Sequence, residues 1–254
     1  MKKRDEGFLN VISIKNKIIK SDADNFLKKI PNNFIDLVVT DPPYGIGISS
    51  WDHKAPTGWC SEIPRILKEN GSLLVFCGKQ NRFEVEKALR ESGLYFWQEL
   101  IWIYGNGGIT RKSSYNGHHE PILWFVKDQT KFKFNIKGNL WIDTWTVIDR
   151  ARPQRNFKKD KKIHPTQKAL EVVKKLIEEH SNPDDIVLDC FMGSGTTAVA
   201  CKQLGRNFIG FEISPEYCKI ANKRLAQNTL NQLKSEGISP PNPKGMGIQN
   251  AKLI

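Results

Sequence analysis

The sequence predicts an α/β protein built on a doubly wound, mostly parallel sheet. Short apolar segments with strand character alternate with amphipathic segments of helical spacing along most of the 254 residues. Two strand segments end in unusual turns, an Asp-Pro-Pro-Tyr turn at 41–44 and a Gly-x-Gly turn at 193–195. Strands that alternate with helices favour parallel pairing, and such sheets bind ligands beyond the carboxyl ends of their strands.

Each expected element rests on its apolar pattern and on the residues at its ends. Residues 11–20 alternate apolar and polar side chains and predict one strand or a short hairpin. The other expected strands are 35–40, 72–77, 95–104, 121–126, 185–189 and 207–213. The expected helices are 25–30, 58–69, 80–92, 166–180, 196–204 and 215 to about 230. Ser214 is a natural N-cap for the last helix, where Pro215 at the first helical position loses no hydrogen bond.

The composition is that of an ordinary globular protein, with 39% hydrophobic and 26% charged residues. A formal net charge of +12 favours a polyanionic partner, nucleic acid ahead of an anionic membrane surface, although a general lysine bias would give the same charge. The five cysteines are scattered without a Cys-x-x-Cys pair, which indicates a reducing compartment. No apolar stretch has the length of a signal peptide or a membrane span, so a soluble cytoplasmic protein without a membrane partner is expected.

The turn at 41–44 follows the apolar strand 35–40 and forms a stiff exit from it. Each proline fixes its own φ, and the residue before a proline is held extended, so the strand cannot continue into a helix. The turn presents an acid, Asp41, at its base and an aromatic ring, Tyr44, at its tip. Taken alone, the pattern fits a ligand site and a proline-rich strand exit with a capping Asp equally well.

The segment 187–197 reads as a strand, a Gly-x-Gly turn and a helix. The glycines let the backbone approach a ligand, and the helix N-terminus offers N–H groups to an anion such as a carboxylate. Glu212 ends the next strand, where an acid binds ribose hydroxyls in nucleoside-binding folds. Ala198 replaces the third glycine of a dinucleotide fingerprint, which disfavours a dinucleotide. The alternative is a tight turn beside a solvated Glu.

Together the two turns resemble the motifs of DNA methyltransferases that act on exocyclic amines. Asp-Pro-Pro-Tyr at 41–44 resembles their catalytic motif, and Asp-x-Phe-x-Gly-x-Gly-Thr-Thr at 189–197 resembles their S-adenosylmethionine loop. The catalytic motif comes first, a basic and aromatic stretch follows, and His-Pro-Thr-Gln-Lys at 164–168 precedes the loop. This order is similar to that of the permuted β-class of N6-adenine and N4-cytosine enzymes. The resemblance covers about residues 11–230, with Ser21 where Gly is usual and Ala169 where Pro is usual.

The resemblance implies a Rossmann-like methyltransferase fold with a small inserted DNA-recognition region. Residues 1–126 would form the catalytic half, 127–163 the target-recognition region and 164–232 the cofactor-binding half. Residues 233–254, rich in Pro, Gly, Asn and Lys, are expected to form a disordered tail.

The implied activity is the transfer of the methyl group of S-adenosylmethionine to N6 of a flipped adenine in double-stranded DNA. Asp41 and the Pro42 carbonyl would accept hydrogen bonds from the amine, Tyr44 would stack on the base, and Pro43 would help to fix their spacing. The implied cofactor-binding residues are Asp22, Asp41, Lys168, Asp189, Phe191, Gly193, Ser194, Gly195, Thr196, Thr197, Glu212 and Ile213.

Double-stranded DNA is the expected partner, and basic side chains would contact its phosphates. The candidates are Arg111, Lys112, Arg150, Arg152, Arg155, Lys158, Lys159, Lys161 and Lys162, while Trp141, Trp145 and Gln154 could approach bases. His118-His119-Glu120 suggests a metal site, but adjacent strand residues point to opposite faces, so no metal is expected. A homodimer and a cognate restriction endonuclease are left open as partners.

Several other functions compete with N6-adenine methylation. N4-cytosine methylation uses the same motifs, although Ser rather than Asp in the first motif position would favour it. Enzymes that methylate RNA or protein glutamine usually have the two motifs in the reverse order. A non-catalytic nucleic-acid-binding protein on the same fold would be favoured by loss of Asp41, which is present. A nicotinamide oxidoreductase is disfavoured by the missing third glycine.

Overall fold

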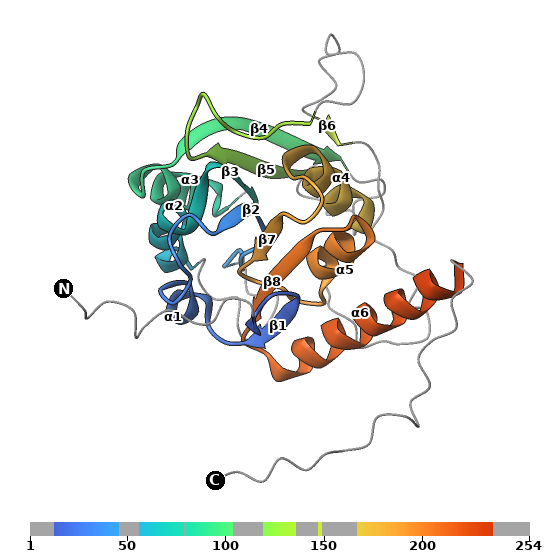
Figure 1. The fold of residues 1–254 in the computed structure, drawn as a ribbon. Helices are drawn as coiled ribbons and strands as arrows, with labels where there is room; N and C mark the ends of the chain where they lie inside the picture. The colour runs from blue at the N-terminus through green and yellow to red at the C-terminus, as the bar shows by residue number, and fades with distance from the viewer. Residues whose placement is uncertain are drawn as a thin grey trace, which may run out of the picture.

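The computed structural model describes residues 13–45, 56–78, 80–103, 119–135, 147–148 and 167–235. In this part of the chain, eight strands form one sheet in the order β1-β8-β7-β2-β3-β5-β4-β6 (Figure 1). The strands are β1 Lys17–Lys20, β2 Ile35–Thr40, β3 Leu67–Phe76, β4 Tyr95–Ile103, β5 His119–Val126, β6 Val147–Ile148, β7 Ile186–Asp189 and β8 Asn207–Glu212. The helices are α1 Ala23–Leu27, α2 Ile63–Ile66, α3 Arg82–Glu91, α4 Leu170–His180, α5 Thr196–Gln203, α6 Pro215–Ser235 and the 3-10 helix η2 Gly58–Glu62.

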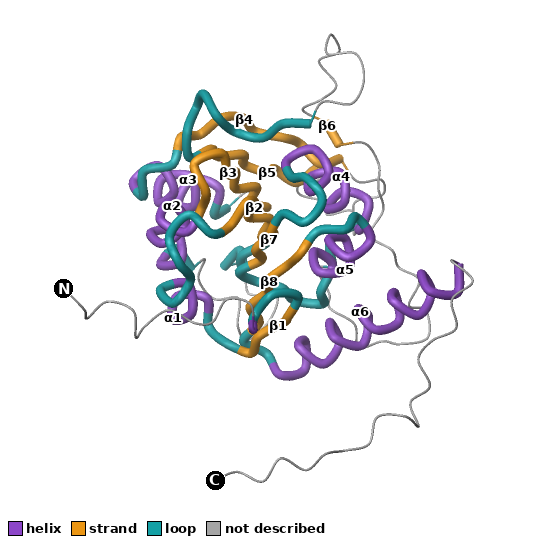
Figure 2. The backbone as a smooth tube through the Cα atoms, viewed as in Figure 1, coloured by secondary structure: helices purple, strands orange, loops and turns teal. Residues whose placement is uncertain are grey.

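The sheet is parallel at one side and mixed at the other. From β1 through β8, β7 and β2 to β3, all neighbouring strands are parallel. β5 lies antiparallel between β3 and β4, and β6 pairs parallel with β4. Figure 2 shows α1 to α3 on one side of the sheet and α4 to α6 on the other. The prediction of a doubly wound, mostly parallel α/β sheet is therefore confirmed.

Two apolar layers produce this arrangement, because neighbouring side chains of a strand point to opposite faces of the sheet. In β2, Val38 packs in one layer with residues of α1, η2, α2 and α3, while Leu37 and Val39 pack in the other with α4 and α5. Every residue of β2 is buried, as expected for a central strand that is covered on both faces. Within the described residues, no helix has the length and apolar character that crossing a bilayer requires.

The segment 58–69 differs from its prediction as a single helix. Its first part is helical, in η2 and α2, but β3 already begins at Leu67. Leu67 pairs with Ile35 of β2, and the ammonium of Lys68 binds the buried carboxylate of Asp36. Strand pairing and this ion pair outweigh the helical spacing of the segment.

Two helix boundaries also differ from the expected ones. Helix α4 begins at Leu170, later than predicted, because Ala169 has an extended backbone with ψ of 128°. Lys168 therefore lies in a non-helical lead-in to α4. Helix α6 continues to Ser235, which makes the first residues of the expected tail helical. The remaining tail residues, 236–254, lie outside the described residues.

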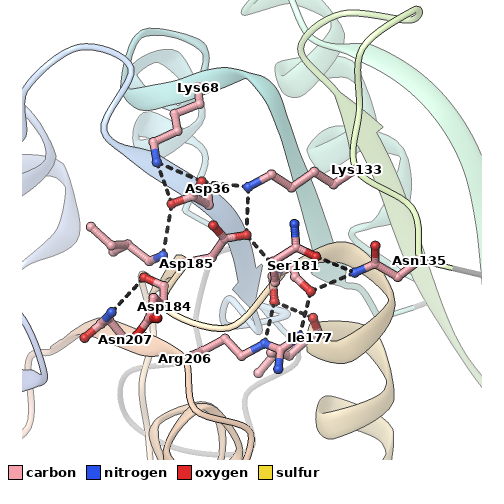
Figure 3. Close-up of polar contacts among 12 residues, drawn as sticks. Asp36, Lys68, Lys133, Asn135, Ile177, Ser181, Asp184, Asp185, Arg206 and Asn207 are labelled. Carbon is pink, nitrogen blue, oxygen red and sulfur yellow. Dashed lines mark hydrogen bonds and ion pairs between the residues drawn. The ribbon is translucent and has the colours of Figure 1, made fainter.

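A buried network of charged side chains lies at the amino ends of β2 and β7 (Figure 3). The Asp36 carboxylate, 2% exposed, accepts hydrogen bonds from Lys68 Nζ at 2.8 Å and Lys133 Nζ at 2.9 Å. It also accepts from the Ile186 backbone N–H at 3.0 Å, and Lys133 binds Asp185 at 2.7 Å. Burial raises the pKa of Asp36, but these hydrogen bonds outweigh burial and hold the pKa below its usual value.

Beside this network, Asn135 fastens the end of the segment that follows β5. Its Nδ2 donates to the carbonyl oxygens of Ser181 at 2.8 Å and Glu178 at 3.2 Å, and its backbone N–H donates to Glu179 O at 2.6 Å. Arg206, just before β8, donates to the same Ser181 carbonyl at 2.7 Å (Figure 3). Asn135 is thus fixed against the end of α4.

Candidate active site

The two unusual turns of the sequence meet at the carboxyl edge of the sheet. β2 and β7 are parallel neighbours, with Leu37 opposite Val187, so the segments that follow them leave the sheet side by side. A cavity of about 340 Å³ lies between 41–44 and the glycine loop at 189–197. Its volume is typical of a small-molecule or cofactor site. Its position agrees with the expectation that ligands bind beyond the carboxyl ends of the strands.

Asp189 at the end of β7 holds the glycine loop in place. Thr40 Oγ1 and the Phe191 backbone N–H donate to its Oδ1 at 2.9 Å and 3.0 Å. Thr197 Oγ1 donates to its Oδ2 at 2.7 Å. Burial raises the pKa of Asp189 to about 6, although these hydrogen bonds act in the opposite direction. The carboxylate therefore ties β7 to β2 and to the start of α5, and it also lines the cavity.

The glycine loop requires glycine at two positions, and side chains of α6 pack against it. Gly193 and Gly195 have φ of 52° and 83°, in the left-handed region. A Cβ on Gly195 would lie 2.8 Å from the Cβ of Ala221 in α6. Arg224 of the same helix donates to the Ser194 carbonyl at 2.5 Å and to Ser194 Oγ at 2.8 Å. Arg224 is not among the predicted site residues, because no local motif links it to the loop.

Two carboxylates border the cavity on the side of β8 and β1. Glu212, 9% exposed, accepts hydrogen bonds from the backbone N–H groups of Gly193 and Ser214, each at 2.8 Å. Burial raises the pKa of Glu212, and these hydrogen bonds partly offset the increase. Asp22 caps α1 by accepting from the Asp24 backbone N–H at 2.8 Å. The predicted cofactor residues that line the cavity are Asp22, Asp41, Lys168, Asp189, Phe191, Gly193, Ser194, Thr196, Thr197, Glu212 and Ile213.

A partly buried polar group lies at the exit of β2, which we call the Asp41 cluster; it comprises Asp41, Tyr44, Glu120 and Lys168. The Tyr44 hydroxyl donates to Asp41 Oδ1 at 2.8 Å and also contacts Glu120 Oε1. Lys168 Nζ lies 3.0 Å from Asp41 Oδ2 and 2.6 Å from Glu120 Oε1. It also donates to the Tyr44 hydroxyl at 3.0 Å. Residues from β2, β5 and the lead-in to α4 are thereby brought together.

Burial dominates the electrostatics of the Asp41 cluster. It raises the pKa of Asp41 to about 6, while Lys168 lowers this pKa and Glu120 raises it further. Burial and the two carboxylates raise the pKa of Tyr44 well above its usual value. Burial lowers the pKa of Lys168, but Asp41 and Glu120 outweigh burial and raise it. At neutral pH, Asp41 is therefore a carboxylate held between a phenol and an ammonium.

Two members of the Asp41 cluster were not predicted in their actual positions. Lys168 is predicted as a cofactor contact, but its ammonium binds Asp41, Glu120 and the Tyr44 hydroxyl. Glu120 enters the sequence analysis only as part of a metal motif, and it lies 76 residues from Tyr44 in the chain. The one available signal was a charged residue at the start of an otherwise apolar strand.

The predicted DNA contacts lie outside the described residues. These are Arg111, Lys112, Arg150, Arg152, Arg155, Lys158, Lys159, Lys161 and Lys162, together with the aromatic and amide candidates Trp141, Trp145 and Gln154. Their roles stay predictions.

Comparison with known proteins identifies the family. The family model of the N6 and N4 methyltransferases, described as DNA methylase, matches residues 35–223. The type II methyltransferase M.HpaI of Haemophilus parainfluenzae is 33% identical over 236 residues, covering 82% of this chain and 74% of the relative. The DNA adenine methyltransferase YhdJ of Escherichia coli K12 is 32% identical over 241 residues, covering 82% of each chain.

Solved structures agree with this assignment. The crystal structure of an M1.HpyAVI–SAM complex matches with a TM-score of 0.66 and 33% identity, covering 82% of this chain and 99% of that one. The cytosine-N4-specific PvuII DNA methyltransferase matches with a TM-score of 0.67 but only 19% identity, which supports the Rossmann-like fold alone. With the family model spanning both unusual turns, the chain belongs to the N6/N4 DNA methylase family.

Proposed function

We propose that the protein transfers the methyl group of S-adenosylmethionine to N6 of an adenine flipped out of double-stranded DNA. The observation that carries this proposal is the single cavity bordered by both the Asp-Pro-Pro-Tyr turn and the glycine loop. An acid and an aromatic ring for the base thereby share one space with a nucleoside-binding loop. The family match and the named adenine methyltransferase among its relatives support the same reaction.

The residues around the cavity fit S-adenosylmethionine. Glu212 and Asp22 offer carboxylate oxygens to the hydroxyl and amino groups of an adenosine, beside the loop at which Gly193 permits close approach. The first turn of α5 faces the cavity through Thr196 and Thr197, where the helix dipole favours the carboxylate of the methionine end. When bound, the cofactor supplies a methyl group that its sulfonium has already activated.

Asp41 prepares the adenine amine for attack. The lone pair of an exocyclic amine is delocalised into the ring, and acceptors for its N–H bonds increase the electron density on nitrogen. Asp41 is one acceptor and the Pro42 carbonyl is a second, because proline lacks a donor but keeps its acceptor. Lys168, 3.0 Å from Asp41, holds the carboxylate in position. With its pKa near 6, Asp41 is also basic enough to take the proton that the methylated amine must lose.

N6-adenine is favoured over N4-cytosine as the target. Asp41 occupies the motif position in which, by resemblance, Ser would favour cytosine. The N4-specific match has only 19% identity and supports the fold alone, whereas the relative named an adenine enzyme is 32% identical. Transfer of radiolabelled methyl to DNA, followed by nucleoside analysis, tests the proposal. We expect label in N6-methyladenine; label in N4-methylcytosine would establish the alternative, and unlabelled DNA would contradict both.

Glu212 provides a test of the cofactor site. We expect Glu212→Gln to weaken S-adenosylmethionine binding about tenfold or more, because hydrogen bonds to a charged group contribute about 1.5–3 kcal/mol. The Gly193 N–H donates to Oε2 and the Ser214 N–H to Oε1, so Gln keeps an acceptor for only one of them and the loop also loses one of its hydrogen bonds. Calorimetry measures the affinity. Glu216→Gln, an exposed change in the first turn of α6, is the matched control and should bind as the wild type does.

Gly78 provides a test of the base site. A Cβ on Gly78 would lie 2.7 Å from Tyr44 Cδ2, so Gly78→Ala must displace the ring. We expect kcat/KM for DNA to fall about tenfold, since stacking of a base on an aromatic ring contributes about 1–3 kcal/mol. Affinity for S-adenosylmethionine, measured by calorimetry, should not change. As a control, Gly93→Ala adds a methyl group with no atom within 4 Å, although φ of 100° makes it a strained position.

The remaining expectations extend the same proposal. Arg111, Lys112 and the basic residues of 150–162 would contact DNA phosphates and give the binding its salt dependence. Residues 127–163 would recognise the target sequence. A cytoplasmic location would give the enzyme access to DNA, and a homodimer or a companion restriction endonuclease would be further partners.

A further inference from the structure

We propose that Glu120 is a positioning residue for methyl transfer, because its carboxylate holds Lys168 and the Tyr44 hydroxyl and thereby keeps Asp41 available to the amine. The inference rests on the proposed function and deepens it. Glu120 itself does not line the cavity, whereas Asp41, Tyr44 and Lys168 do. It therefore acts through its neighbours.

The contacts of Glu120 are short and shielded from water. Its Oε1 lies 2.6 Å from Lys168 Nζ and contacts the Tyr44 hydroxyl. The side chains of Lys168 and Glu120 are 10% and 15% exposed, and that of Asp41 is 24% exposed. Glu120 is the second residue of β5, where it pairs in register with Trp102 of β4, so its backbone is fixed by the sheet. A carboxylate on a rigid strand thus supports two groups on flexible side chains.

The contacts of Glu120 with Lys168 and Tyr44 affect Asp41 because the three residues share a limited number of hydrogen-bond donors. An ammonium has three N–H donors and a phenol has one O–H donor. Lys168 contacts Asp41, Glu120 and Tyr44, which uses all three of its donors. Tyr44 has a single proton, and both Asp41 and Glu120 lie within its reach. Glu120 therefore takes one of the three Lys168 donors and competes with Asp41 for the single Tyr44 proton.

Loss of this competitor would change the state of Asp41. Lys168 and Tyr44 would then turn wholly to Asp41 and occupy the lone pairs that the adenine amine requires. Asp41, Glu120 and Lys168 together carry a formal charge of −1 at neutral pH, and a neutral residue at 120 would bring it to zero. The other titratable groups around Asp41 are Asp189 at the end of β7 and Cys77 after β3, both of which stay in place.

The pH dependence distinguishes this role from a purely structural one. The negative charge of Glu120 raises the pKa of Asp41, so its removal must lower that pKa. The acidic limb of kcat/KM, which reports the free enzyme, should therefore move to lower pH while the plateau falls. A Glu120 that only stabilises the fold would change the melting temperature and leave the position of the acidic limb unchanged.

The experiment compares Glu120→Gln with two other variants. Glu86→Gln is the matched control, since Glu86 is 18% exposed and pairs with Arg90 at 2.9 Å on α3, away from the cavity. Glu120→Asp keeps the charge and shortens the side chain. It also allows the proposal to be tested if Glu120→Gln fails to fold. For Glu120→Gln we expect kcat to fall about tenfold to 100-fold, as for small misplacements of reacting groups, with the acidic limb shifted downward. Glu120→Asp should keep the wild-type acidic limb with a reduced plateau.

A readout without cofactor or DNA completes the test. In protein with 13C-labelled tyrosine rings, the Tyr44 resonance, identified by its absence in Tyr44→Phe, should move in Glu120→Gln and stay in Glu86→Gln. A wild-type protein that transfers no methyl group to DNA overturns the proposed function and this inference with it. A functional wild type matched by Glu120→Gln in kcat, acidic limb and Tyr44 resonance overturns this inference alone.

Discussion

Replacement of Asp41 by alanine should lower methyl transfer at least about 100-fold while S-adenosylmethionine still binds. The removed carboxylate is the acceptor on which the reactivity of the amine depends, and loss of one preorganised electrostatic partner costs about 2.7–4 kcal/mol. The fold should survive, because Lys168 keeps Glu120 at 2.6 Å and the Tyr44 hydroxyl keeps its contact with Glu120. No buried charge is then left without a partner.

The measurement pairs single-turnover methyl transfer with calorimetry of the cofactor on the same preparation. In the wild type, kcat/KM should fall as the pH drops below about 6, since protonation removes the carboxylate form of Asp41. The alanine variant should lack this dependence in its residual activity. Turnover close to that of the wild type would rule out Asp41 as the acceptor.

Replacement of Asp36 by asparagine should destabilise the fold by about 3 kcal/mol, the lower end of the cost of breaking a buried ion pair. Asp36 is 2% exposed and neutralises Lys68 and Lys133; among the described residues, Lys133 keeps a second carboxylate, Asp185, whereas Lys68 does not. The Lys68 side chain is 40% exposed and can turn to water, so the lower figure is appropriate. Urea unfolding measures the difference.

The effect of Asp36 should depend on pH. The pKa of Asp36 is lowered in the folded state, so its stabilising contribution is present above the unfolded pKa of about 3.9. It is lost as the pH falls through the lower folded pKa, and the two proteins should then converge in stability. Glu91→Gln, which loosens an exposed pair with Lys87 at 3.8 Å, should cost less than about 0.5 kcal/mol. An Asp36→Asn protein as stable as this control would contradict a role for the network.

Local sequence patterns predicted most of the helices and strands and the two turns that border the cavity. Apolar segments with regular spacing predicted the alternation of strands and helices, and the turns at 41–44 and 189–197 could be placed at strand ends. Glu212 could be located because its distance along the chain from Gly193 is set by one helix and one strand. In each case the residues lie close in sequence, or at the carboxyl ends of parallel strands, which meet at the same edge of the sheet.

Contacts between distant segments could not be predicted. Glu120 reaches the site only because β5 inserts antiparallel between β3 and β4, a register that no local pattern determines. Arg224 supports the glycine loop through the packing of α6. The helical spacing of 58–69 wrongly predicted a helix beyond Ile66. The spacing does not show that Lys68 binds a buried carboxylate, Asp36, from a strand.

The two anchors around residues 136–166 have an evolutionary consequence. Asn135 is held by the end of α4, and Lys168 is held in the Asp41 cluster, so the chain on either side of this stretch is fixed independently of it. Insertions, deletions and replacements between the anchors, outside Val147–Ile148 of β6, which pairs with β4, would leave the Asp41 cluster and the glycine loop in place. Evolution could therefore replace this stretch, and with it the DNA sequence that the enzyme recognises, while the residues that bind the cofactor and the amine stay the same.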